Sequence, residues 1–131
     1  MSIEKENIMT ISMADFIKRM KLFFPDIEDD IANSDFDSYD GLETILIEDI
    51  IMPKVIKLLK ENDDRAKLEE LFSYFENVVL NADEILLNIF SITVLEILGN
   101  EKIILDIAKN YMGPETTLKQ READESLGRA I

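Results

Sequence analysis

The chain of 131 residues has 28 acidic and 14 basic side chains and no histidine, which gives a net charge of −14. A field of this sign repels nucleic-acid phosphates and anionic membranes but attracts basic proteins, so no direct nucleic-acid partner is expected. The absence of cysteine excludes disulfides and, together with the absence of histidine, the usual zinc sites. The length predicts a single domain over residues 1–131, and the balance of 47% apolar and 32% charged residues excludes a disordered or membrane chain. No cofactor is expected.

The N-terminal residues MSIEKENIMTIS lack the continuous apolar core of a secretory signal. The longest apolar region runs from Ile85 to Leu98 and contains Asn88 and Glu96, so it is too short and too polar to span a bilayer. A cytoplasmic protein with no membrane partner is therefore expected.

The first predicted helix begins at a capping box formed by Ser12 and Asp15, and its apolar spacing continues to Phe23. Pro25 ends this pattern. The segment from Pro25 to Leu42 is rich in turn-forming residues, and we expect it to be mostly loop, with room for one short helical turn.

A second helix is predicted over residues 43–61, with Pro53 inside it. Because proline removes a backbone hydrogen bond, the helix either kinks at Pro53 or ends near Met52 and restarts. Asn62 and Asp63 are predicted to cap a third, amphipathic helix that reaches Val79.

Asp83 is predicted to open a fourth helix over residues 84–98, which is apolar on nearly every side and is therefore expected to be central. Gly99 is expected to close it in the left-handed conformation, and Asn100 to cap a fifth helix that ends at Tyr111.

Gly113 and Pro114 mark one more helix start. The apolar residues of this last helix are few, so residues 114–131 are expected to dock loosely; they are Leu118, Ala123 and Leu127. No segment alternates with the period of a half-buried strand. The predicted fold is all-α, either an antiparallel helical bundle or a short α-solenoid-like stack of about six helices.

Acidic residues cluster between Lys21 and Lys54, where ten acids and no base occur. Inside this block, the segment SDFDSYDGLE resembles the start of a calcium loop. Counted from Asp35, however, Tyr39 takes an oxygen-ligand position, Asp40 the glycine position and Leu46 the position of the bidentate glutamate. We therefore expect no metal site.

Two interpretations of the acidic block remain open. In one, its acids are turn residues that face water. In the other, the block forms a surface for a basic partner, where Phe36 and Tyr39 anchor and the carboxylates steer. The candidate partner-binding residues are Asp26, Glu28, Asp29, Asp30, Asp35, Phe36, Asp37, Tyr39, Asp40 and Glu43.

We expect no catalysis, because the chain has no histidine or cysteine, no phosphate-binding glycine loop and no nucleophile elbow. The segment from Tyr111 to Thr116 also has two interpretations. It is either a simple turn between helices or a fixed corner that presents Tyr111 and the amide end of the last helix.

The C-terminal segment ILGNEKIILDIAKNYMGPETTLKQREAD, and YMGPET in particular, resembles small, acidic, all-helical bacterial proteins of largely uncharacterised families. Some of these are similar to immunity proteins of polymorphic-toxin systems. The resemblance implies a cytoplasmic binder that neutralises a cognate toxin by masking it, and the negative charge suits a basic toxin such as a nuclease. The alternative function is a helical adaptor or scaffold of a bacterial assembly.

Overall fold

The computed structural model describes residues 10–33 and 43–129. Within these ranges the chain forms seven continuous helical segments and no strand, which confirms the predicted all-α class, and the packing fits a bundle. The elements are α2 (Met13–Phe23), α3 (Asp26–Ala32), α4 (Glu43–Leu46), η1 (Ile47–Ile51), α5 (Met52–Glu61), α6 (Arg65–Asn81), α7 (Glu84–Ile89), η2 (Phe90–Leu95), α8 (Glu96–Leu98), α9 (Lys102–Lys109) and α10 (Pro114–Ser126). Two of the segments contain a π-helical turn and are divided into three elements each: α4, η1 and α5, and α7, η2 and α8.

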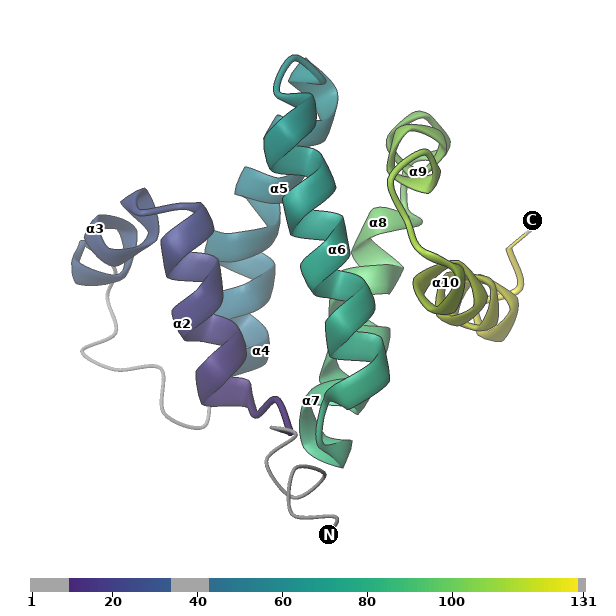
Figure 1. Cartoon of the computed structure of the whole chain (residues 1–131), viewed down its shortest axis with the longest axis horizontal. Helices are drawn as coiled ribbons and strands as arrows, with labels where there is room; N and C mark the ends of the chain where they lie inside the picture. Colours follow the sequence, from purple (N-terminus) through teal and green to yellow (C-terminus); the bar gives the residue numbers. More distant parts are fainter. Residues whose placement is uncertain (1–9, 34–42, 130–131) are drawn as a thin grey trace, which may run out of the picture.

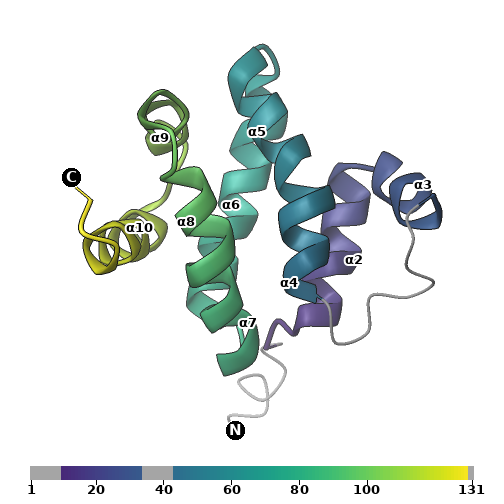
Figure 2. The ribbon, with the colours of Figure 1, turned by 180° about the vertical axis from the view of Figure 1, so that it is seen from behind.

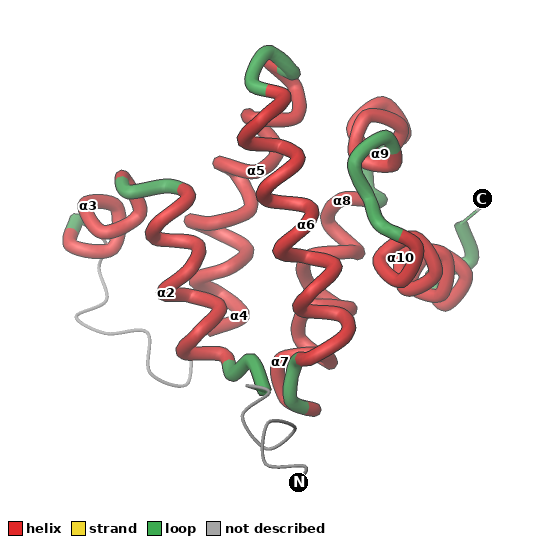
Figure 3. The backbone as a smooth tube through the Cα atoms, in the orientation of Figure 1, coloured by secondary structure: helices red, strands yellow, loops and turns green. Residues whose placement is uncertain are grey.

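The longer helices form the middle of the molecule. Four helical segments lie side by side with their axes roughly vertical in the view (Figures 1 and 2). They are α2, α4 with α5, α6, and α7 with α8. α3 lies at one end of the long axis, whereas α9 and α10 lie at the other (Figure 1). Short turns join most of these helices, and the coloured tube in Figure 3 shows how little of the described chain is not helical.

The start of α2 is fixed by the predicted capping box. The Asp15 backbone N–H donates to the Ser12 hydroxyl oxygen at 3.1 Å, and the Ser12 N–H donates to the Asp15 carboxylate at 3.0 Å. The residue before them, Ile11, is buried and pairs with the turn between α6 and α7: its N–H donates to the Asn81 carbonyl, and its carbonyl accepts from Asp83. These bonds hold the beginning of α2 against that turn.

The segment after Pro25 is more ordered than the sequence suggested. The prediction of mostly loop is wrong for Asp26–Ala32, which forms the whole of α3. Two apolar contacts favour this helix: Ile27 is fully buried and Ile31 is partly buried against the core, while their acidic neighbours face solvent. Burial of these two side chains favours a helix that the polar composition alone does not predict.

Pro53 neither ends nor restarts its helix, because helical backbone continues from Glu43 to Glu61. The π-helical turn η1 lies just before the proline, and the Met52 N–H donates to the carbonyl of Ile47, five residues earlier. Such a wide turn accommodates Pro53, because proline has no N–H to donate and its ring crowds the preceding turn. The interruption therefore takes the form of a π-turn within one continuous helix.

The fourth predicted helix, residues 84–98, is central as expected and also contains a π-helical turn, η2. This turn buries Phe90, whose ring lies edge-on to Phe16 at 6.0 Å and to Phe75 at 5.2 Å between centroids. Aromatic rings from α2, α6 and η2 thus meet in one cluster. Edge-to-face pairs of this kind add to the energy of their burial.

The predicted N-caps Asn62, Asp63 and Asn100 are wrong, whereas Gly99 does close the fourth predicted helix but not in the predicted conformation. Asn62 does not open α6 but closes α5 in the left-handed conformation, with φ of 46°. The side chain that caps α6 is that of Asp64, which accepts from the Lys67 N–H at 3.2 Å. Gly99 is right-handed, with φ of −84°. Asn100 gives no cap to α9; its side-chain oxygen accepts from Arg129 at 2.6 Å.

Candidate functional site

The predicted partner-binding residues divide between described and undescribed parts of the chain. Asp26, Glu28, Asp29 and Asp30 belong to α3, and Glu43 is the first residue of α4. The other five lie outside the described residues; they are Asp35, Phe36, Asp37, Tyr39 and Asp40. The interpretation of Phe36 and Tyr39 as anchors stays a prediction.

α3 packs against η1, and both elements carry exposed acidic residues, which we call the acidic surface. We define this acidic surface by six exposed carboxylates, namely Asp26, Glu28, Asp29 and Asp30 of α3 with Glu48 and Asp49 of η1. Lys54 pairs with Asp30 at 2.8 Å, and Lys21 approaches Glu28 at 3.9 Å. The two bases that border the acidic block in the sequence therefore neutralise part of this surface. Among the described residues, the other four carboxylates form no ion pair.

The described residues contain no group of three or more acidic side chains placed to hold a metal ion. Nor is any helix in the ranges 10–33 and 43–129 long and apolar enough to cross a membrane.

The corner from Tyr111 to Thr116 is tied to the rest of the bundle. The Tyr111 hydroxyl donates to the Asn62 side chain at 3.0 Å, and its half-buried ring lies 6.1 Å from that of Phe72. The amide end of α10 is occupied by Glu76 of α6. The corner therefore does not present the amide end of the last helix, and that part of the second interpretation is wrong.

The Glu76 carboxylate works as a cap supplied by another helix. One oxygen accepts from the Glu115 N–H at 2.9 Å, and the other accepts from the Thr116 N–H at 2.9 Å and the Thr116 hydroxyl at 2.8 Å. Burial raises the pKa of Glu76, but the hydrogen bonds from Thr116 and Glu115 outweigh it and hold this pKa below its usual value. A Cβ at Gly113 would lie 2.5 Å from the Glu76 carboxyl carbon, so the close approach requires glycine.

The buried face of α10 is mostly polar. Thr116, Gln120 and Asp124 are each at most 1% exposed, whereas the apolar Leu118 is 49% exposed. The Gln120 amide N–H₂ donates to the Leu95 carbonyl at 2.9 Å and to Asp124 at 3.1 Å. The sequence prediction considered apolar contacts alone; the structure adds hydrogen bonds that attach α10 to α6 and η2.

Arg129 completes this polar cluster. Its guanidinium donates to the same Asp124 oxygen at 3.0 Å, and a second N–H donates to Asn100 at 2.6 Å. A Cβ at Gly99 would lie 2.5 Å from that oxygen and would also meet the guanidinium. Gly99 is therefore required for a close approach, not for a left-handed turn. The second carboxylate oxygen of Asp124 and the amide oxygen of Gln120 are buried and have no hydrogen-bond partner within the described ranges.

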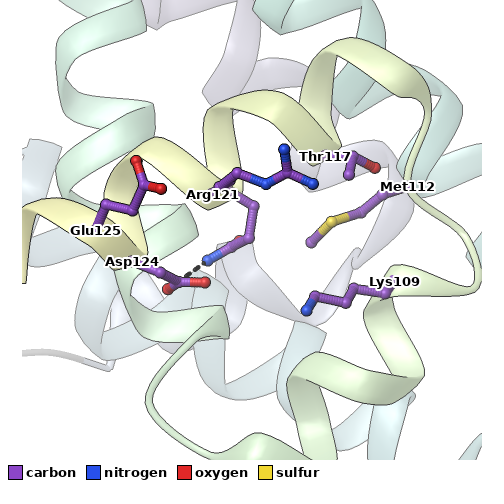
Figure 4. A pocket seen from close by; sticks show the side chains of 7 residues that line it. Lys109, Met112, Thr117, Arg121, Asp124 and Glu125 are labelled. Carbon is purple, nitrogen blue, oxygen red and sulfur yellow. Dashed lines mark hydrogen bonds between the residues drawn. The ribbon is translucent and has the colours of Figure 1, made fainter. Parts of the chain in front are cut away.

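A hollow of about 510 Å³ lies between α9 and α10, next to this cluster. Figure 4 shows Lys109 of α9 and Met112 on one side of it and Arg121, Asp124 and Glu125 of α10 on the other. A second hollow of about 480 Å³ shares Lys109 and Asp124 with the first. We call the first of these the α9–α10 pocket.

Sequence reasoning missed Glu76, Gln120, Asp124 and Arg129. A signal for two of them was present: Thr116, Gln120 and Asp124 recur at the spacing of one helix face, which was not recognised because they are polar. No comparable pattern marks Glu76, because its partners lie 39 and 40 residues away in the sequence.

The fold and these sites define an all-helical protein with exposed acids on α3 and η1 and a C-terminal helix attached by polar contacts. The chain belongs to the family described as a domain of unknown function, DUF7674, whose model matches residues 17–124. No curated protein and no solved structure shows significant similarity to the chain.

Proposed function

We propose that the chain is a non-enzymatic, cytoplasmic immunity-type protein that neutralises a basic bacterial toxin by masking it. The acidic surface of α3 and η1 is the proposed contact, extended by Glu43 and by the predicted residues outside the described ranges. The resemblance of the C-terminal segment to immunity proteins suggests the class. The net charge of −14 gives the expected sign of the partner.

The observation that carries this proposal is the arrangement of charge on α3 and η1. Six exposed carboxylates lie on two packed elements, and in the described part of the chain only Lys21 and Lys54 form ion pairs with them. Charges that remain unpaired at a surface attract a partner of opposite sign and speed its association. They contribute little to the stability of the protein itself.

The direct test is to co-express the chain with the product of an adjacent gene that encodes a large secreted protein, and to measure the association rate of the complex at low and high salt. Asp29→Lys combined with Asp49→Lys should slow association by about tenfold at low salt, because both side chains are exposed and lack ion pairs among the described residues.

The matched control combines Glu61→Lys with Glu70→Lys, which changes the net charge equally at exposed positions of α5 and α6. An equal loss in both variants would mean that total charge, not this surface, attracts the partner. An association rate that ignores both salt and the Asp29/Asp49 substitutions would contradict the proposal.

A second candidate function, a helical adaptor, is supported by a groove of about 460 Å³ between α5 and α8. Met52, Pro53, Ile56 and Ile97 provide its apolar lining. An adaptor that uses this groove should bind its partner through apolar contacts, so its complex should persist at high salt. Persistence at high salt together with loss on Ile56→Ser would favour this function over the first.

A further inference from the structure

Unsatisfied polar groups line the α9–α10 pocket, at the opposite end of the long axis from α3 (Figure 1). Two of them are acceptors: the second carboxylate oxygen of Asp124 and the amide oxygen of Gln120. Both residues are buried, and each is only 1% exposed. A buried acceptor without a donor costs free energy, so groups of this kind are good candidates to bind a ligand.

The same pocket is lined by two cations without ion pairs. Lys109 comes from α9 and Arg121 from α10, and both are exposed and form no ion pair with any residue in the described ranges. The neighbouring cations are already engaged, because Lys102 pairs with Asp106 and Arg129 with Asp124. Figure 4 shows the Lys109 side chain extending from α9 into the space between the two helices and the Arg121 guanidinium beside Thr117 of α10.

A ligand that complements this arrangement has hydrogen-bond donors at one end and a negative charge at the other. An ammonium group has three donors and can serve both free acceptors, and a carboxylate can accept from both cations. A ligand with a single charge would leave either the two acceptor oxygens or the two cations without a partner. Glu125, which also lines the pocket, disfavours a ligand that is only anionic.

We propose that the α9–α10 pocket binds a small zwitterion with the chemistry of a free α-amino acid, its ammonium group toward Asp124 and Gln120 and its carboxylate toward Lys109 and Arg121. The volume of about 510 Å³ lies in the range of ordinary small-molecule sites. The apolar Met112 and the Thr117 hydroxyl line the same space and would contact the ligand side chain. This site is independent of the proposed toxin-binding surface, since it shares no residue with it.

The test uses the full chain and the twenty standard amino acids, each titrated singly while backbone amide resonances are followed by NMR. At least one amino acid should shift the resonances of Lys109, Gln120, Arg121 and Asp124 and saturate them. Its N-acetyl derivative and its methyl ester should each bind at least about tenfold more weakly, since each lacks one of the two charges. If no amino acid saturates these shifts at about 10 mM, the proposal is overturned.

Variants separate the two ends of the ligand. Lys109→Met combined with Arg121→Gln changes exposed side chains only, so the fold should persist, and affinity for the amino acid should fall at least about tenfold while affinity for its methyl ester changes little. Glu125→Gln, in the same helix, is the control and should not weaken binding. Unchanged affinity in the double variant, or a methyl ester that binds as well as the amino acid, would overturn the assignment. Neither outcome bears on the acidic surface.

Discussion

The central helices and α10 are attached to the same bundle by different kinds of contact. Phe16, Phe75 and Phe90 hold α2, α6 and η2 together through buried rings. α10 instead presents Thr116, Gln120 and Asp124 to its neighbours and leaves Leu118 half exposed. Apolar contact is roughly proportional to area and tolerates small shifts, whereas hydrogen bonds require defined geometry. The bundle therefore owes its stability mainly to buried apolar side chains, and the position of α10 mainly to a few polar groups.

The largest effect should come from the aromatic cluster. Phe90→Ala removes a fully buried ring that contacts Phe16 and Phe75, and should lower the free energy of unfolding by about 3–5 kcal/mol. Denaturant unfolding followed by circular dichroism measures this loss. Leu118→Ala, at an exposed position of α10, should change the same quantity by less than about 0.5 kcal/mol. Similar losses in both variants would contradict the division between the two regions.

Asp124→Ala should have a smaller and more local effect. It leaves donors of Gln120 and Arg129 without their acceptor, which should cost about 1–3 kcal/mol. Because this acceptor positions α10 and not the core, amide hydrogen exchange should accelerate in α10 while α6 stays protected. Glu125→Ala, at the next and exposed position, serves as the control. Equal acceleration throughout the core would show that α10 and the bundle unfold as one unit.

Acidification tests the same attachment through Glu76. Its pKa is held below the unfolded value, so its contribution to stability is fully present above the unfolded pKa and is lost as the pH falls through the folded pKa. In Glu76→Gln an amide N–H₂ replaces one of the two acceptor oxygens. The free energy of unfolding at neutral pH should fall by about 1–2 kcal/mol, as for the loss of other helix caps. The difference in stability between the native chain and this variant should shrink on acidification. A difference that is constant with pH would contradict the role of the Glu76 carboxylate.

The two kinds of contact also explain how far the sequence alone could be read. The apolar period of 3.6 residues located the central helices, because their faces are buried by apolar side chains such as Phe16, Phe75 and Phe90. α3 was not predicted as a full helix because only two apolar residues among its acids, Ile27 and Ile31, pack it against the core. Periodicity also says nothing about a π-turn, so the form of the interruption near Pro53 could not be predicted from it.

The candidate sites were harder to predict for the same physical reason. The acids of α3 are evident from composition, and the described acids of α3 and η1 do face solvent, whereas Glu43 is half-buried. The polar cluster of α10 depends on contacts distant in sequence, such as Gln120 with Leu95 and Arg129 with Asn100. The glycines were predicted only as markers of helix ends. Gly99 and Gly113 also leave room for polar side chains that approach the backbone closely, which only the folded structure shows.

The smallest effect on stability should come from the acidic surface. Asp29→Lys combined with Asp49→Lys should change the free energy of unfolding by less than about 1 kcal/mol, because each exposed charge contributes little and neither forms an ion pair within the described ranges. Denaturant unfolding at low and high salt measures this. A large loss would mean that these carboxylates hold the fold, as Asp124 does, and would remove the argument that they are free for a partner. A small loss of stability together with slower toxin association would instead show that charge has different roles in the two regions. The buried charge of α10 positions that helix, whereas the exposed charge of α3 attracts a partner.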